Sequence, residues 1–315
     1  CESANVVRVP ILGTLTQIIR VLSEVDAEVE AEEEDSTAAA GGFHVSQLWP
    51  TVMPLVAVST DGAEPESEYL CDDALGLWHA AMDASKEYTA DMHALFPSLP
   101  QLMRYSVGHV DDVAALLEDY ILLGGSTFLE AHAGDVSDIL ANAFGAVRPA
   151  TAQRLGRTAG SLVDAFPEEA SELLRGVLMQ VLVSAAQNDD RASVIVTYLS
   201  LLARVFIHCS DFFCGLVRDA AVEGGASEAD AADVGFAQAV DLWLERFDEA
   251  AEIGPWVQKL WAMAMVHALA VGGARLPHDT ITGVLFQLVD AIATTDAAAK
   301  RPGSLLPSDL AGNVG

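Results

Sequence analysis

Apolar residues recur along the chain with the spacing of an α-helix, and polar residues fill the positions between them. Between residues 111 and 121 one apolar stripe consists of Val113, Leu116, Leu117, Tyr120 and Ile121, and the acidic residues of this segment lie off the stripe. Segments that alternate between apolar and polar residues, as β-strands do, are nearly absent. The pattern therefore predicts an all-α protein.

Proline residues mark where several helices begin. Pro149, Pro167, Pro255 and Pro277 each stand at the head of an apolar-periodic segment, where the missing N–H group leaves no hydrogen bond unmade. The periodicity and these start signals predict helices over the ranges 5–23, 45–60, 67–84, 90–104, 108–123, 126–147, 150–165, 168–187, 191–208, 210–223, 229–248, 255–271 and 278–294.

The predicted helices follow one another with a regular spacing. Every second helix, counted from the third, starts near residue 67, 108, 150, 191 or 229, so the repeating unit is a helix pair of about 40 residues. The segment 193–206 carries two apolar stripes, and a helix of that kind must pack on two sides. Both features are typical of a superhelical α-α solenoid of antiparallel helix pairs, of the HEAT or armadillo type.

We expect the repeat array to cover residues 1–295, because no Pro- or Ser-rich linker divides this range. Two longer segments resist assignment to a helix. Residues 24–43 are expected to form an acidic inter-helix loop, and residues 296–315 a loosely ordered C-terminal tail. The chain opens on Cys1, directly before an apolar helix, so we interpret it as a fragment.

The balance of charge narrows the possible partners. The 315-residue chain has 16 Lys plus Arg and 46 Asp plus Glu, which gives a formal charge of −30. An acidic surface repels nucleic acid and anionic membranes, and it favours basic proteins as ligands. Mean hydropathy is high, at +0.31, but no apolar run reaches the roughly 18 residues that a membrane-spanning helix needs. We therefore expect no nucleic-acid binding and no membrane insertion.

The cysteines offer one candidate metal site. Cys1, Cys71, Cys209 and Cys214 are too few and too scattered for a disulfide framework, so we expect reduced thiols and an intracellular location. The string HCSDFFC, residues 208–214, has the density of ligands that zinc prefers. However, Cys209 and Cys214 lie off a common helical face, and no second Cys/His pair occurs elsewhere. We interpret both cysteines as small core residues and predict no metal site.

No catalytic motif is apparent. The sequence lacks GxGxxG, P-loop, GxSxG and HExxH patterns. In CDDALGLWH, residues 71–79, the two acids and the histidine are too far apart in sequence to share one helical face. We therefore predict neither an enzymatic activity nor a cofactor.

Five strings, taken in order, resemble one family. They are ILGTLTQIIRVLSEVD, YLCDDALGLWHAAMD, EDYILLGGSTFLEAH, TYLSLLARVFIHCSDFF and DLWLERFDEAAEIGPWVQKLWAMAMVHAL. Together they resemble the C-terminal third of nuclear transport receptors of the importin-β (karyopherin) family, over residues 5–295. The resemblance implies a HEAT-repeat array that wraps cargo.

The resemblance also implies partners and a location. Receptors of this family carry cargo through the nuclear pore, bind the GTPase Ran in its GTP form, contact Phe-Gly nucleoporins and shuttle between nucleus and cytoplasm. The repeats that make the family's main Ran contact are not in this chain, and the acidic run is expanded relative to the family pattern. The leading hypothesis is a cargo-binding fragment of a nuclear import receptor. The alternative is a HEAT-repeat interaction scaffold without a transport role.

The acidic run is the candidate binding site. Residues 24–35, EVDAEVEAEEED, carry eight carboxylates and no Lys or Arg. Like charges at this density repel one another, so we expect a mobile, solvated loop. Either the loop only keeps the protein in solution, or it attracts basic cargo proteins. In the second case the residues expected to contact cargo are Glu30, Glu32, Glu33, Glu34 and Asp35.

Overall fold

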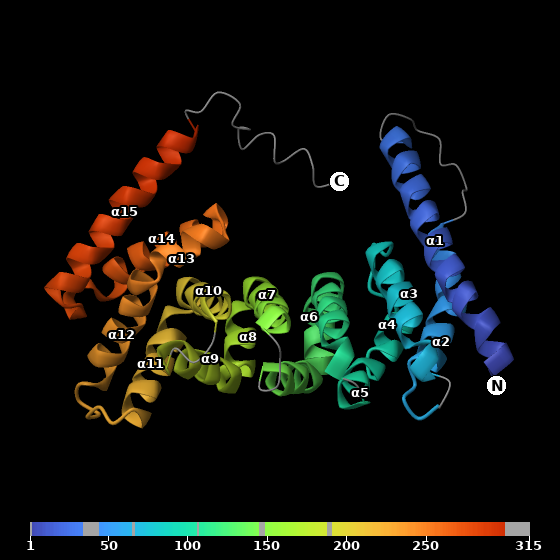
Figure 1. The fold of residues 1–315 in the computed structure, drawn as a ribbon, viewed down its shortest axis with the longest axis horizontal. Coiled ribbons are helices and arrows are strands. Elements are labelled where there is room, and N and C mark those ends of the chain that lie inside the picture. The colour runs from blue at the N-terminus through green and yellow to red at the C-terminus, as the bar shows by residue number, and fades with distance from the viewer. Residues whose placement is uncertain are drawn as a thin grey trace. The chain divides into compact units, whose positions relative to one another are not determined.

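The computed structural model describes residues 2–33, 44–64, 67–105, 107–144, 149–187 and 191–299. Within these ranges every regular element is a helix, so the all-α prediction is confirmed. The chain forms two compact units, Cys1–Phe166 and Pro167–Gly315, which are called unit 1 and unit 2 below. Figure 1 labels the helices of each unit in chain order.

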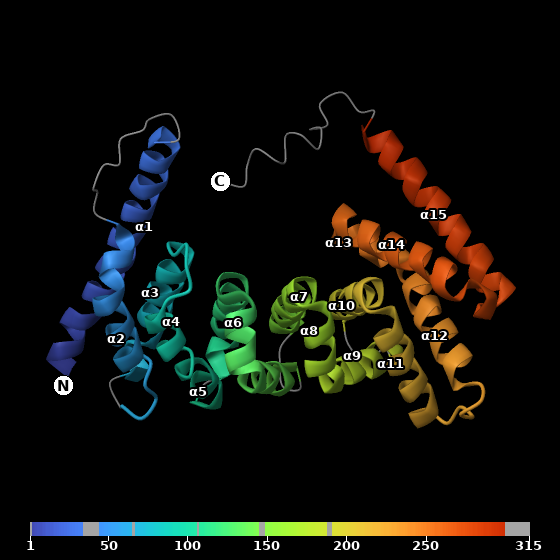
Figure 2. The same ribbon diagram turned by 180° about the vertical axis from the view of Figure 1, so that it is seen from behind.

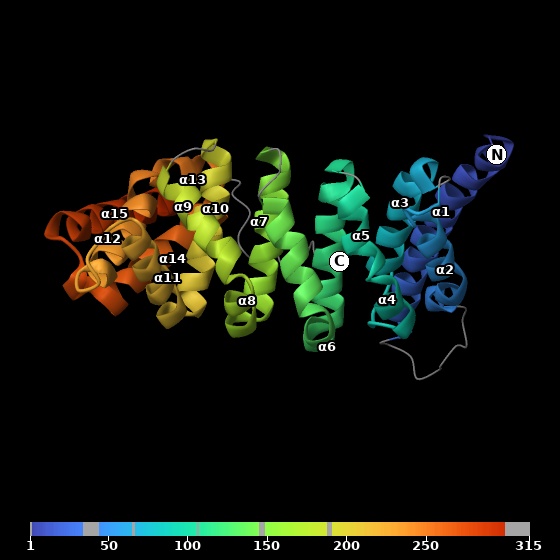
Figure 3. The same cartoon turned by 90° about the horizontal axis from the view of Figure 1, so that it is seen from below.

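Unit 1 is a stack of helices in which each packs mainly on its neighbours. Helix α3 packs on α1, α2 and α6, and α6 packs on α5 and α7. The last pair, α6 and α7, lies side by side in Figures 1, 2 and 3. The elements of unit 1 are α1 (Glu2–Glu33), η1 (Val45–Leu48), α2 (Trp49–Ser59), η2 (Ser67–Tyr69), α3 (Cys71–Asp83), α4 (Ala90–Leu95), α5 (Ser98–Tyr105), η3 (Val107–His109), α6 (Val110–Phe144) and α7 (Pro149–Ala165).

Unit 2 is also a stack of helices that pack mainly on their neighbours. Helix α10 packs on α9, α11, α13 and α14, and α12 packs on α11, α14 and α15. The neighbours α11 and α12 are seen together in Figures 1 and 2. The elements of unit 2 are α8 (Pro167–Leu173), α9 (Arg175–Gln187), α10 (Ala192–His208), α11 (Ser210–Glu223), α12 (Ala231–Glu245), α13 (Phe247–Ile253), α14 (Pro255–Gly272), η4 (Gly273–Arg275) and α15 (His278–Ala299).

Several side chains that bond between helices have partners about one repeat away in sequence. In unit 1 the sequence separations are 42 for Trp78 with Tyr120, 40 for His79 with Asp119, and 44 for Thr158 with the Ala114 carbonyl. In unit 2 they are 44 for Arg175 with Asp219, 44 for Trp243 with the Leu199 carbonyl, and 42 for Arg275 with Asp233. The predicted solenoid of stacked helix pairs is therefore confirmed within each unit.

Helix α1 is longer than predicted. The sequence analysis ended this helix near residue 23 and placed a loop at 24–43, but the helix continues to Glu33. Residues 34–43 lie outside the described residues. Each pair of like charges one turn apart costs a helix only a few tenths of a kcal/mol, and Ala and Glu are good helix formers. The prediction gave the repulsion too much weight for the run of Ala and Glu after Val25.

Helix α6 is interrupted at a glycine. Gly125 has φ 56° and ψ −144°, inside the left-handed region where other residues are strained. The interruption separates the two helices that the sequence predicted at 108–123 and 126–147. A second departure from helical angles occurs at His132, with φ −126° and ψ 15°.

The core of unit 1 is a cluster of aromatic rings around Tyr120. Its hydroxyl donates to the Met92 carbonyl at 2.9 Å and accepts the indole N–H of Trp78 at 3.3 Å. Phe96 and Phe128 contact the same ring, with centroid distances of 5.0 and 5.4 Å. All of these aromatic side chains are fully buried, so one phenol ties α3, α4 and α6 together.

Two histidines lie at the edge of this cluster. His132 Nε2 is 3.3 Å from His93 Nδ1, and the Tyr88 hydroxyl is 3.2 Å from the same nitrogen of His93. His132 Nδ1 is 3.7 Å from Asp135. Burial lowers the pKa of His132 from its ordinary 6.5, and His93 lowers it further, while Asp135 acts in the opposite direction.

We predict that acidification destabilises the fold through His132. The unfolded chain binds a proton at this imidazole below about pH 6.5, whereas the folded protein does so only at lower pH. The stability that the neutral His132 imidazole contributes is present above the pKa of this group in the unfolded chain, and it is lost as the pH falls. Urea unfolding at pH 7.5 and 5.5 is expected to show a smaller loss of stability for His132→Asn than for wild type.

The exposed His278 at the start of α15 provides the control. His278→Asn is expected to retain the wild-type difference between the two pH values. If His132→Asn also retains it, the histidine pair does not act on stability.

A close approach of helices depends on one glycine of α12. A Cβ at Gly235 would clash with the backbone carbonyl of Val217 on α11. We predict that Gly235→Ala lowers the free energy of unfolding by about 1–3 kcal/mol, because the helices must separate. Gly215→Ala on α11 is the control: nothing lies within 4 Å of its added Cβ. That change is expected to raise stability by up to about 1 kcal/mol. Equal urea midpoints for the two variants would contradict this account.

Candidate functional site

The acidic run lies at the C-terminal end of α1. Glu30, Glu32 and Glu33 belong to its last turns, and Glu34 and Asp35 lie outside the described residues. No basic residue occurs in the last turn of this helix. The C-terminus of any helix carries a partial negative charge, so the helix dipole and the acidic residues have the same sign here. The charge of the run and the helix dipole therefore add at this end of α1.

Asp26 attaches the beginning of the run to the next element. Its Oδ2 accepts the backbone N–H of Val45 at 3.0 Å. Val45 is the first residue of η1, whose own N-cap residue, His44, makes no side-chain capping bond. Asp26 thus supplies the missing cap from another helix. Sequence reasoning missed this role, because it treated all eight carboxylates as free charges.

A cavity of about 290 Å³ lies beside this contact. Its polar lining includes Asp26, His44, Lys86, Glu87 and Thr89. Both signs of charge are present, so the cavity is not selective for anions or cations by charge alone. The cavity lies between Asp26 of α1 and the segment that joins α3 to α4.

The HCSDFFC string is divided by a helix boundary. His208 is the last residue of α10, Cys209 has the non-helical angles φ −133° and ψ 65°, and α11 begins at Ser210. The ring of Phe212 lies under the guanidinium of Arg175, 4.8 Å away, and Phe213 is fully buried. Cys209 and Cys214 are half-buried free thiols.

The residues of CDDALGLWH have separate partners. His79 Nδ1 is 3.1 Å from Asp119 on α6, whereas Asp72 is 3.5 Å from Nδ1 of His109 in η3. These contacts tie α3 to its neighbours and do not assemble a catalytic group. Among the described residues, no group of three His, Cys, Asp or Glu side chains is placed to hold a metal ion.

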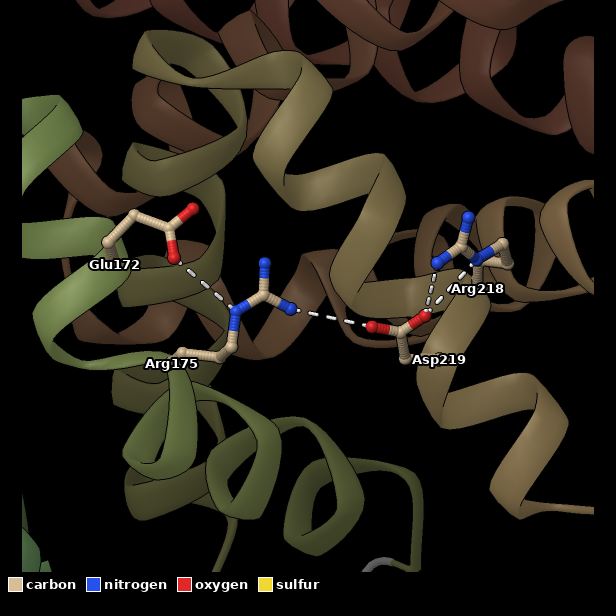
Figure 4. A network of polar contacts seen from close by, with 4 residues as sticks. All are labelled: Glu172, Arg175, Arg218 and Asp219. Carbon is tan, nitrogen blue, oxygen red and sulfur yellow. Dashed lines mark hydrogen bonds and ion pairs between the residues drawn. The ribbon is translucent and has the colours of Figure 1, made fainter.

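Sequence reasoning also missed a charged network in unit 2, shown in Figure 4. Arg175 Nε lies 3.5 Å from Glu172, and its Nη1 lies 3.4 Å from Asp219. Asp219 also accepts from Arg218 at 2.7 Å. No sequence signal links residues 44 positions apart in this way until the register of the repeats is known.

The pairing of arginines leaves the surface acidic. In unit 2, Arg246 is 2.8 Å from Glu249 and Arg275 is 2.7 Å from Asp233, in addition to the network around Arg175. Each of these arginines has a carboxylate partner, and the whole chain has 46 Asp plus Glu against 16 Lys plus Arg, so acidic residues remain in large excess. In the described parts of the chain no helix has the length and apolar character needed to cross a membrane.

Comparison with known proteins agrees with this architecture. Residues 35–295 match the family model described as "Importin-11-like, TPR repeats". The chain is 21% identical to Importin-11 of Mus musculus over 291 residues, which are 92% of this chain and 27% of that protein. It is 21% identical to Importin-11 of Homo sapiens over 284 residues, 90% of this chain and 26% of that protein.

The chain thus spans about a quarter of the length of these relatives. No solved structure gives a significant match. The contacts between residues 40 to 44 positions apart are closer to the HEAT repeat, about 40–47 residues, than to the TPR repeat of about 34. The match over residues 35–295, together with the stacked helix pairs of both units, shows that the chain belongs to the importin-11-like family.

Proposed function

We propose that this chain is a cargo-binding portion of a nuclear import receptor. The observation that carries the proposal is the family match, which covers residues 35–295 and follows the stacked helices of both units. Repeat arrays of this kind act by offering long surfaces to other proteins. Catalysis has no part in the proposal.

The electrostatics support basic proteins as the cargo. The formal charge is −30, and several arginines of unit 2 are held by carboxylates. At the end of α1 the acidic residues add to the negative end of the helix dipole. Long-range attraction of this sign increases the rate at which basic proteins associate.

The regulation, further partners and location that we propose are those that membership of the family implies. We propose that cargo binding is regulated by Ran in its GTP form, mainly through repeats outside this chain, and that Phe-Gly nucleoporins bind during passage through the pore. The protein would then shuttle between nucleus and cytoplasm. The alternative is a repeat scaffold that organises other proteins and takes no part in transport.

One experiment separates the receptor from the scaffold. The full-length protein is loaded with a fluorescent Lys/Arg-rich peptide, and Ran with a non-hydrolysable GTP analogue is then added. A receptor for import is expected to release the peptide, whereas Ran bound to GDP leaves it in place. Retention of the peptide with both forms of Ran would favour the scaffold.

We predict that the acidic run strengthens the binding of a basic cargo peptide. The variant replaces Glu30, Glu32, Glu33, Glu34 and Asp35 with Ser. At an ionic strength of about 0.02 M it is expected to bind the peptide roughly tenfold more weakly than wild type, because exposed charges act over long distances in dilute salt. At about 0.5 M salt the difference is expected to disappear.

A second variant controls for the change in net charge. It replaces five exposed acids outside the run with Ser: Glu64, Glu130, Asp138, Glu245 and Glu252. This variant loses the same charge and is expected to bind much more tightly than the first. If the two variants bind alike, the run has no special role and only the total charge matters.

A further inference from the structure

A cleft opens between three helices of unit 2. It has a volume of about 370 Å³. Pockets that bind small ligands or single side chains begin at about this size. The residues that line it come from α9, from α11 and its C-cap residue Gly224, and from α12; the larger apolar side chains among them are Leu182, Val183, Val217 and Leu242.

Small side chains keep the cleft open. Ala186 contributes from α9, Ala220 from α11 and Ala239 from α12, so no long side chain of these positions fills the space. Gly235 and Val217 also line the cleft, and Gly235 allows α12 to touch the backbone of α11 at Val217. Most of the lining side chains are therefore apolar and small, and the helix-to-helix contacts set the width of the cleft.

The lining has three polar side chains, of which Gln187 and Glu223 stand at helix ends and Gln238 lies within α12. Gln187 is the last residue of α9, and Glu223 is the last residue of α11. The negative ends of both helix dipoles are thus at the cleft, and the Glu223 carboxylate adds a full charge. None of the residues lining the cleft is basic.

The basic residue of α11 does not oppose this charge. Arg218 lies outside the lining, and its Nη2 is 2.7 Å from the carboxylate of Asp219, as Figure 4 shows. An apolar slot with a negative rim disfavours anions, which would lose hydration without gaining a positive partner. It suits a ligand that is apolar at one end and cationic at the other.

We propose that this cleft anchors one large apolar side chain of a basic peptide segment, and that the adjacent Lys or Arg lies against Glu223 and the ends of α9 and α11. The inference rests on the proposed function for the source of the segment, which is the cargo. It differs from the attraction by the acidic run, because the cleft selects an apolar residue next to the positive charge.

The probe is a fluorescein-labelled peptide, Ser-Lys-Lys-Leu-Trp-Lys-Ser, titrated by anisotropy. Two control peptides carry Ser in place of Leu and Trp, or Gln in place of the three Lys. Wild-type protein is expected to bind the first peptide at least tenfold more tightly than either control. Equal binding of all three peptides would overturn the proposal.

Two substitutions at exposed positions test the cleft itself, each with a matched control. Ala186→Phe fills the slot and is expected to weaken binding at least tenfold, whereas Ala251→Phe on α13 leaves it unchanged. Glu223→Gln is expected to weaken binding about threefold, the size usual for one exposed ion pair, whereas Glu228→Gln has no effect. The threefold effect is expected to vanish with the Gln peptide. Thermal melting verifies that every variant is folded.

The outcomes separate this inference from the proposed function. If Ala186→Phe and Glu223→Gln bind the peptide like wild type, the cleft is not its site, and the cargo proposal stands on the acidic run and the Ran experiment. If both weaken binding but Ran-GTP leaves cargo bound, the cleft is a peptide site on a scaffold. Absence of measurable peptide binding to wild-type protein overturns the inference.

Discussion

Helix α10 is buried around its circumference, and this burial constrains the rest of unit 2. Residues from Val194 to Phe206 are buried almost without interruption. Any polar group that faces α10 must therefore find its partner within the protein, since an unpaired one costs about 1–3 kcal/mol. Trp243 of α12 donates to the Leu199 carbonyl at 3.0 Å, and Trp261 of α14 donates to the Ser200 hydroxyl at 3.0 Å. Adjacent residues of one helix thus hold two others in place.

The two apolar stripes of α10 made its two-sided packing predictable, because a helix with no polar face has no other stable environment. The interruption near Gly125 and the repeat of about 40 residues could also be predicted from the sequence. The sequence analysis predicted a loop where α1 continues to Glu33. Helix propensity favours the helix there and charge repulsion opposes it, and the two free energies are small and similar. The hydrogen bond from Val45 N–H to Asp26 depends on where η1 packs against α1, and no local sequence pattern predicts that packing.

The cleft between α9, α11 and α12 was beyond sequence reasoning for a different reason. Its alanines and glycines look like any small residues of buried helix faces, and small residues usually allow helices to pack closely. Gly235 does so against Val217, but Ala186, Ala220 and Ala239 leave space instead. Which outcome occurs depends on the angle and separation of three helices, and these follow from contacts one repeat away.

The acidic run is helical as far as Glu33, and this has a geometric consequence. Positions four apart on a helix, such as Glu24, Glu28 and Glu32, are about 6 Å apart along its axis. Alternate residues of an extended peptide are about 6.6 Å apart, nearly the same interval. A mobile loop would present these charges at changing distances, whereas the helix arranges their backbone positions in a row with a fixed step. A partner with a basic residue at every second position would match that step over several charges.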